Sequence, residues 1–102
     1  MMADSEEMLH LCQRVREYVA NRDYKKCREE ISYAMYLQPD LPEPHNLMGI
    51  LLEKQQDHAG AMRHFRAAYA LDPSYLPARE NLMEYAQLSH KVMCRYTLAD
   101  CE

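Results

Sequence analysis

Apolar residues recur at helical spacing in two segments in the middle of the chain. Residues 42–53 follow the i, i+1, i+4, i+5 pattern of one apolar helix face, at Leu47, Met48, Leu51 and Leu52. Residues 58–71 show a similar apolar face, formed by Ala61, Met62, Phe65, Ala68 and Tyr69. The few residues between the two segments allow only a tight turn. The pattern therefore predicts two amphipathic helices that pack antiparallel as a hairpin.

The second half of this pattern occurs twice in the chain. Shifting the sequence by 34 positions superposes residues 23–39 on residues 57–73. Aspartate then matches aspartate at the turn and proline matches proline at the end, while Ile31 faces Phe65. A single hairpin cannot bury both of its faces, so repetition at this period indicates helical units that stack on one another.

The remaining patterns extend this prediction to the rest of the chain. Helices are expected over residues 6–19 and 24–37, the second ending before a proline. A helical pattern from Leu76 has no clear breaker, which predicts one long helix to about residue 98 or two with a break near Ser89-His90. The tyrosines and methionines on the apolar stripes are expected to form the core: Tyr18, Met35, Met48, Met62 and Tyr69. The chain is thus expected to be one all-α domain built from antiparallel helix hairpins.

The central segment closely resembles the tetratricopeptide repeat, whose unit is 34 residues long. The resemblance rests on the small, small, aromatic, small and proline positions, which are Gly49, Ala61, Phe65, Ala68 and Pro73. It implies an α-solenoid of about two and a half units, closed by a C-terminal capping helix. Within the single domain, residues 1–102, the units would be residues 8–41 with a degenerate first helix, residues 42–75, and a partial third unit over residues 76–102.

The resemblance also implies where a partner would bind, because the first helix of each unit lines the concave face of such an array. Carried over position by position, the groove residues are Cys12, Arg16, Glu43, Asn46, Ile50, Glu53, Lys54, Glu80, Glu84 and Gln87. The glutamates would favour a basic or amino-terminal peptide, and Asn46 is expected to hydrogen-bond an extended backbone. The alternative is that these glutamates form an ordinary solvated helix face.

The function implied by the resemblance is a non-catalytic protein-interaction module that binds a partner peptide or helix in the groove. The alternative is homodimerisation or assembly through the C-terminal helix, whose apolar residues would be Val92, Met93, Tyr96 and Leu98. A clamp for the acidic tails of chaperones is not expected. At most two of the five corresponding positions are suitable, and these positions are Cys12, Arg16, Leu47, Pro77 and Asn81.

Charge and composition narrow the class of partner. The formal net charge is -4, so the chain offers no basic surface for nucleic acid or for an anionic membrane. No apolar run reaches the length of a membrane span, and residues 1–7 lack the basic and apolar regions of a secretion signal. We therefore expect a cytoplasmic protein that binds protein or peptide, and neither nucleic acid nor membrane.

The cysteines and histidines give little support to metal or catalytic chemistry. No Cys-x-x-Cys pair occurs among the 4 cysteines, and His58 and His64 are expected to face solvent. A metal or thiol site near His90, Cys94 and Cys101 is a distant third hypothesis, because a fourth ligand is missing. No phosphate-binding loop or nucleophile motif is present, so no enzymatic activity, metal or cofactor is expected.

Overall fold

Five α-helices and one short 3₁₀ helix form the described part of the chain. The computed structural model describes residues 2–86 and 95–101. The elements are α1 (Met2–Ala20), α2 (Tyr24–Leu37), α3 (Pro42–Lys54), α4 (His58–Leu71), α5 (Leu76–Tyr85) and the 3₁₀ helix η1 (Leu98–Cys101). Helices α2 and α4 begin and end at the predicted residues, whereas α1 begins earlier than expected. The described residues contain no strand, so the all-α class is confirmed.

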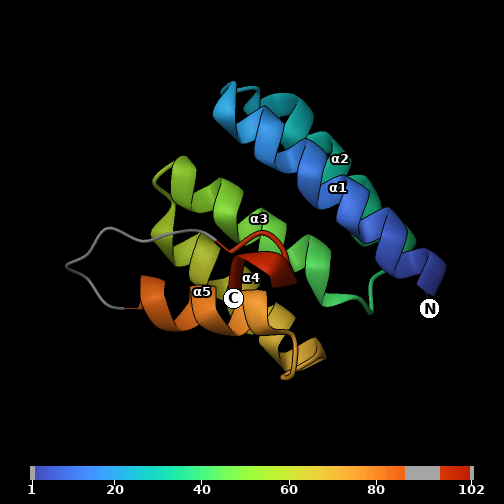
Figure 1. Ribbon diagram of the computed structural model, residues 1–102. Helices are drawn as coiled ribbons and strands as arrows, with labels where there is room; N and C mark the ends of the chain where they lie inside the picture. The colour runs from blue at the N-terminus through green and yellow to red at the C-terminus, as the bar shows by residue number, and fades with distance from the viewer. Residues whose placement is uncertain (1, 87–94, 102) are drawn as a thin grey trace.

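Helix α3 lies at the centre of the array. Nine of its 13 residues are buried, and it packs against α1, α2, α4 and α5. The α1–α2 and α3–α4 pairs form stacked hairpins, and α5 follows on the far side of the second hairpin (Figure 1). The largest fully buried apolar side chains come from four of these helices and are Val15, Ile31, Leu47, Ile50, Leu51 and Phe65. The predicted array of helix hairpins is therefore confirmed.

The turns within the two hairpins have the same backbone geometry at the repeat spacing. Arg22 in the first turn and Gln56 in the second have left-handed φ values of 57° and 66°. The next residues, Asp23 and Asp57, donate their backbone N–H to a carbonyl five positions earlier, at 2.8 Å in both turns. A left-handed residue followed by this bond is a common way to end a helix and reverse the chain. The two units therefore share backbone structure as well as sequence.

The chain beyond α5 differs from the long helix that the sequence predicts. Helix α5 ends at Tyr85, and residues 95–97 are not helical. Residues 95–101, which we call the C-terminal strap, instead return to α3 and α5 (Figure 1). The prediction of a continuous helix is wrong because the backbone N–H and C=O of Arg95 both bond to the side chain of Asn81. The predicted break near Ser89-His90 lies outside the described residues.

Two side chains of α4 also differ from expectation. Tyr69, predicted in the core, is 41% exposed, whereas Met35, one unit earlier, is partly buried against the second unit. No described helix covers Tyr69 in the same way, because a second helix of the third unit is not among the described elements. His64, predicted to face solvent, is half-buried, and its Nδ1 lies 3.1 Å from Nδ1 of His45. The apolar pattern of one helix does not reveal such neighbours.

Candidate functional site

The C-terminal strap bonds to the first helix of every unit. Its partners are Arg16 on α1, Asn46 on α3, and Asn81 on α5. These three helices carry the residues that the sequence analysis assigns to the groove. The strap therefore lies on the surface where the resemblance implies that a partner would bind.

Two buried asparagines hold the backbone of Arg95. Asn81 Oδ1 accepts from the backbone N–H of Arg95 at 2.8 Å, and Asn81 Nδ2 donates to the Arg95 carbonyl oxygen at 2.9 Å. Asn46 Nδ2 donates to the same oxygen at 2.9 Å, and Asn81 Nδ2 also donates to Asn46 Oδ1 at 2.8 Å. Both asparagines are fully buried. In the strap, this pair, which we call the asparagine clamp, bonds to the peptide groups of Arg95, and such bonds do not depend on side-chain type.

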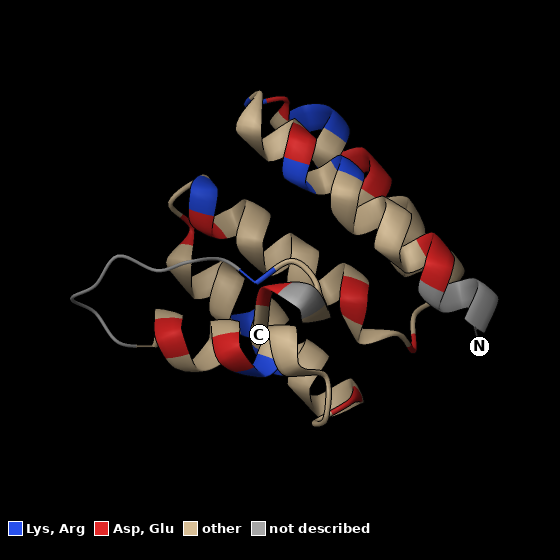
Figure 2. Ribbon diagram, in the orientation of Figure 1, with Lys and Arg blue, Asp and Glu red and all other residues tan. Residues whose placement is uncertain are grey.

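Two carboxylates on α5 surround the side chain of Arg95. Its Nε donates to Glu80 and its Nη2 donates to Glu84, each at 2.9 Å. The two glutamates lie one helical turn apart, beside the strap (Figure 2). The hydrogen bond to Glu80 raises the pKa of Arg95. This acidic pair therefore forms a site for a forked cation.

Arg16 joins the other end of the strap to α1. Its guanidinium lies 4.7 Å from the ring centroid of Tyr96 and pairs with the carboxylate of Asp100. The same carboxylate accepts the backbone N–H of Tyr96 at 2.9 Å and that of Thr97 at 3.2 Å. Tyr96 is only 9% exposed. Asp100 thus closes the strap into a compact turn, and Arg16 holds both its aromatic and its acidic side chain.

The predicted groove residues divide into those at the strap and those away from it. Four of them bond to the strap: Arg16, Asn46, Glu80 and Glu84. Cys12 and Ile50 are instead buried in the core. Burial, with a smaller effect from Glu43, raises the pKa of the Cys12 thiol to about 12. Both side chains contribute to packing, and Cys12 also lines a hollow beside the strap.

The other predicted positions have different surroundings. Glu43 lines a hollow of about 310 Å³ beside the strap, and its Oε1 lacks a hydrogen-bond partner among the described residues. Burial raises the pKa of this carboxyl group. Glu53 lies 2.6 Å from Nδ1 of His58 at the start of α4. Lys54 is exposed at the end of α3, and Gln87 lies outside the described residues.

Sequence reasoning did not identify the strap or the role of Asn81. A shift of 34 positions aligns Asn46 with Glu80, yet the side chain that bonds to Asn46 is Asn81, which lies 35 positions away. In the sequence, Asn81 stands out only as one of the five positions that correspond to a chaperone-tail clamp. Arg95 and the residues after it lie beyond the repeat pattern, so periodicity offers no register for them. The only available signal was a polar amide on the first helix of two successive units.

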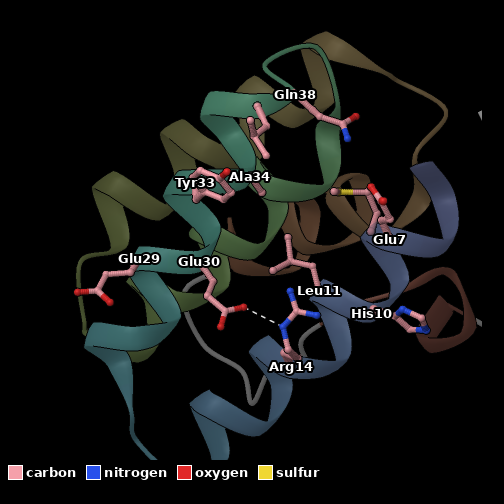
Figure 3. A pocket seen from close by; sticks show the side chains of 11 residues that line it. Glu7, His10, Leu11, Arg14, Glu29, Glu30, Tyr33, Ala34 and Gln38 are labelled. Carbon is pink, nitrogen blue, oxygen red and sulfur yellow. Dashed lines mark hydrogen bonds and ion pairs between the residues drawn. The ribbon is translucent and has the colours of Figure 1, made fainter. Parts of the chain in front are cut away.

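A second hollow, of about 500 Å³, lies between α1 and α2 (Figure 3). Leu11 and Ala34 contribute apolar surface to it, and Tyr33 at its edge is 63% exposed. Arg14 on α1 pairs with Glu30 on α2 at 2.8 Å across it (Figure 3). All of its lining residues come from the first hairpin and the residue that follows it. This hollow offers apolar surface, but it has no counterpart of the asparagine clamp.

The described residues contain neither a group of metal ligands nor a membrane-spanning helix. Among residues 2–86 and 95–101, no three His, Cys, Asp or Glu side chains are grouped so that they could hold a metal ion. His90 and Cys94 of the third hypothesis lie outside the described residues. Cys101 is half-buried, and burial raises the pKa of its thiol to about 11. No helix in the same described ranges combines the length and apolar character needed to cross a membrane.

Comparison with known proteins identifies the central hairpin. Residues 42–75 match the family model for the tetratricopeptide repeat. The matched segment contains α3 and α4 and the turn between them. No curated protein and no solved structure matches the chain.

Proposed function

We propose that this chain, which carries a tetratricopeptide repeat at its centre, is a non-catalytic module that binds an extended segment of another protein on its concave face. Tetratricopeptide repeats generally mediate binding between proteins. The observation that carries the proposal is the asparagine clamp, which bonds to both the N–H and the C=O of one residue of the strap. The segment seen there belongs to the chain itself, and it supports the proposal because a peptide offers the same backbone groups.

The clamp is fully satisfied while the strap covers it. With the strap in place, Asn46 and Asn81 are buried, and their amide groups bond to the Arg95 backbone and to each other. A buried polar group that loses its partner costs about 1–3 kcal/mol, whereas a satisfied hydrogen bond contributes about 1 kcal/mol. A peptide that supplies an N–H and a C=O at this position satisfies both amides. The concave face is therefore suited to bind peptide backbone.

The charges around the clamp set a preference among peptides. Glu80 and Glu84 are partly exposed and face the position occupied by Arg95. Glu43 adds a third carboxylate at the hollow beside the strap. Exposed ion pairs contribute only about 0.2–1 kcal/mol each, so they select among peptides more than they add affinity. We propose that the partner segment is basic at the position next to α5.

A peptide-display selection on the full chain tests the proposal. Because the strap pairs with Arg16 and Glu84, the substitutions are made in a chain whose strap is weakened by Arg95→Ala/Asp100→Ala. In that chain, selected peptides are expected to bind the Arg16→Glu and Glu84→Lys variants about tenfold more weakly, a loss of about 1.4 kcal/mol. Arg66→Glu is the control matched to Arg16→Glu. Arg66 is an exposed residue of α4, so this substitution makes the same change of charge away from α1, α3 and α5. Affinities can be measured by fluorescence anisotropy, and circular dichroism confirms that each variant is folded.

Two results would contradict the proposal. Peptides whose binding survives both concave-face substitutions but is lost in Tyr33→Ala would move the site to the hollow between α1 and α2. A doubled mass in native mass spectrometry, with no selected peptide, would favour the self-association predicted as the alternative. Tyr96, one of the apolar residues assigned to that dimer contact, is buried against its own chain in this structure.

A further inference from the structure

The strap makes side-chain contacts in addition to the backbone bonds of the asparagine clamp, through Arg95, Tyr96 and Asp100. We infer that the partner segment carries the same pattern as residues 95–100, an arginine followed by an aromatic residue and then, four positions after the aromatic, a carboxylate. We infer also that the strap competes with this segment for the concave face. This inference rests on the proposed function and specifies its partner.

The first position of the pattern is specific for arginine. Arg95 uses Nε for Glu80 and Nη2 for Glu84, so one planar group bonds to two carboxylates a helical turn apart. Like charges at this spacing on a helix repel each other, and a cation between them removes that repulsion. The ammonium of lysine is a compact charge without the fixed fork, so it cannot reproduce the two bonds with the same geometry. Arginine is therefore expected to bind more tightly than lysine.

The second and last positions are recognised together by one side chain. Arg16 lies 4.7 Å from the ring centroid of Tyr96 and also pairs with Asp100. An arginine attracts an aromatic face and a carboxylate at the same time, since its guanidinium is planar, cationic and rich in donors. A partner with only one of these two groups would leave part of this contact unmade.

The turn that presents these groups is formed by the segment itself. The Asp100 carboxylate accepts the backbone N–H groups of Tyr96 and Thr97, and the N–H of Asp100 donates to the carbonyl of Thr97 at 3.0 Å. None of these bonds requires another part of the chain. A free peptide with this sequence therefore contains every group that the concave face contacts in the strap.

The strap has an advantage over a free peptide because it belongs to the same molecule. A tethered segment acts at an effective concentration on the order of millimolar, so a free peptide binds only to the extent that it displaces the strap. Weakening the strap without changing the concave face should strengthen the binding of the peptide. A structural role for the strap alone predicts no such gain.

The test uses a labelled peptide with the sequence of residues 95–101, Cys101 replaced by serine and both ends blocked. Its affinity is measured by fluorescence anisotropy for the full chain and for the full-length Arg95→Ala/Asp100→Ala variant. The variant is expected to bind the peptide about tenfold more tightly, because its own strap competes less well. Adding Glu80→Gln/Glu84→Gln to this variant is expected to remove that gain, and a lysine in place of the peptide's arginine should weaken binding.

A scrambled peptide of the same composition separates this inference from the proposed function. Equal binding of the ordered and scrambled peptides would overturn the inferred pattern, while loss of both in Asn81→Ala would still support capture of extended backbone. Equal affinity of the ordered peptide for the wild-type chain and the strap variant would overturn the competition. Absence of binding by either peptide would also overturn the inference, and the display selection then decides the proposed function separately.

A measurement on the unaltered chain covers the case in which the strap variant does not fold. In nuclear magnetic resonance spectra of the wild-type chain, the ordered peptide is expected to shift the side-chain amide signals of Asn46 and Asn81. The scrambled peptide is the control. Shifts confined to the hollow between α1 and α2 would contradict the inference.

Discussion

Gly49 on α3 lies so close to the ring of Phe65 on α4 that a methyl group added at Gly49 would be 2.5 Å from Phe65 Cε1. Both residues are buried, and Phe65 is among the largest fully buried side chains of the protein. The small and aromatic positions of the repeat pattern are therefore two halves of one contact. This contact allows α3 and α4 to pack closely.

Gly49→Ala is expected to destabilise the protein by about 1–3 kcal/mol through overpacking. Alanine stabilises a helix by about 1 kcal/mol compared with glycine, and this gain offsets part of the loss. Urea denaturation monitored by circular dichroism measures the free energy of unfolding. In a chain that already carries Phe65→Leu, adding Gly49→Ala should lower the free energy of unfolding by less than Gly49→Ala does in the wild-type chain. Unchanged or increased stability of Gly49→Ala would show that the ring moves aside without cost.

Asp57→Ala is expected to cost about 1 kcal/mol, because the Asp57 side chain caps the first turn of α4. Its Oδ1 accepts the backbone N–H of Gly60 at 2.9 Å. Asp23 occupies the equivalent position before α2 but makes no side-chain capping bond, so Asp23→Ala is the matched control. Thermal unfolding should show a clearly larger loss for Asp57→Ala. Equal losses would mean that the capping bond does not account for the effect.

The paired histidines predict that stability falls on mild acidification. Burial lowers the pKa of His45 and His64 below the ordinary value near 6.5, and His45 lowers that of His64 further. The unfolded chain then binds more protons, so stability is full above pH 6.5 and decreases as the pH falls towards the lowered values. The slope reaches at most about 1.4 kcal/mol per pH unit for each extra proton bound by the unfolded chain. Melting temperatures between pH 7.5 and 5 should fall less steeply for His64→Gln, and an identical slope would contradict this account.

Glu43→Gln is expected to stabilise the protein at pH 7 by up to about 1 kcal/mol, since it removes a half-buried charge whose Oε1 has no hydrogen-bond partner among the described residues. The pKa of Glu43 is raised by burial, so the folded chain binds a proton more readily than the unfolded chain. The difference between variant and wild type should therefore shrink as the pH falls below the raised pKa, where Glu43 is protonated. Glu17→Gln, which removes an exposed charge from α1, is the control. A gain that persists at low pH would point to a cause other than charge.

Local sequence determined the boundaries of α2 and α4. The 34-residue shift, the aspartates after the turns and the prolines after α2 and α4 were sufficient to predict those two helices residue by residue. Helix formation and helix ending depend on near neighbours along the chain, so the necessary information lies within each segment. The repeat pattern marks Gly49 and Phe65 as small and aromatic positions, but their close contact follows only from the packing of α3 against α4.

The occupied concave face depended on contacts between residues far apart in sequence. Asn46 bonds to a residue 49 positions away, and Arg16 pairs with one 84 positions away. The strap has no helical period that could predict its path, and the pairing of Asn46 with Asn81 departs by one position from the repeat shift. Periodicity predicts which face of a helix is covered, but it does not identify the polar groups that meet there. Those partners follow only from the packing of the three first helices around the returning chain.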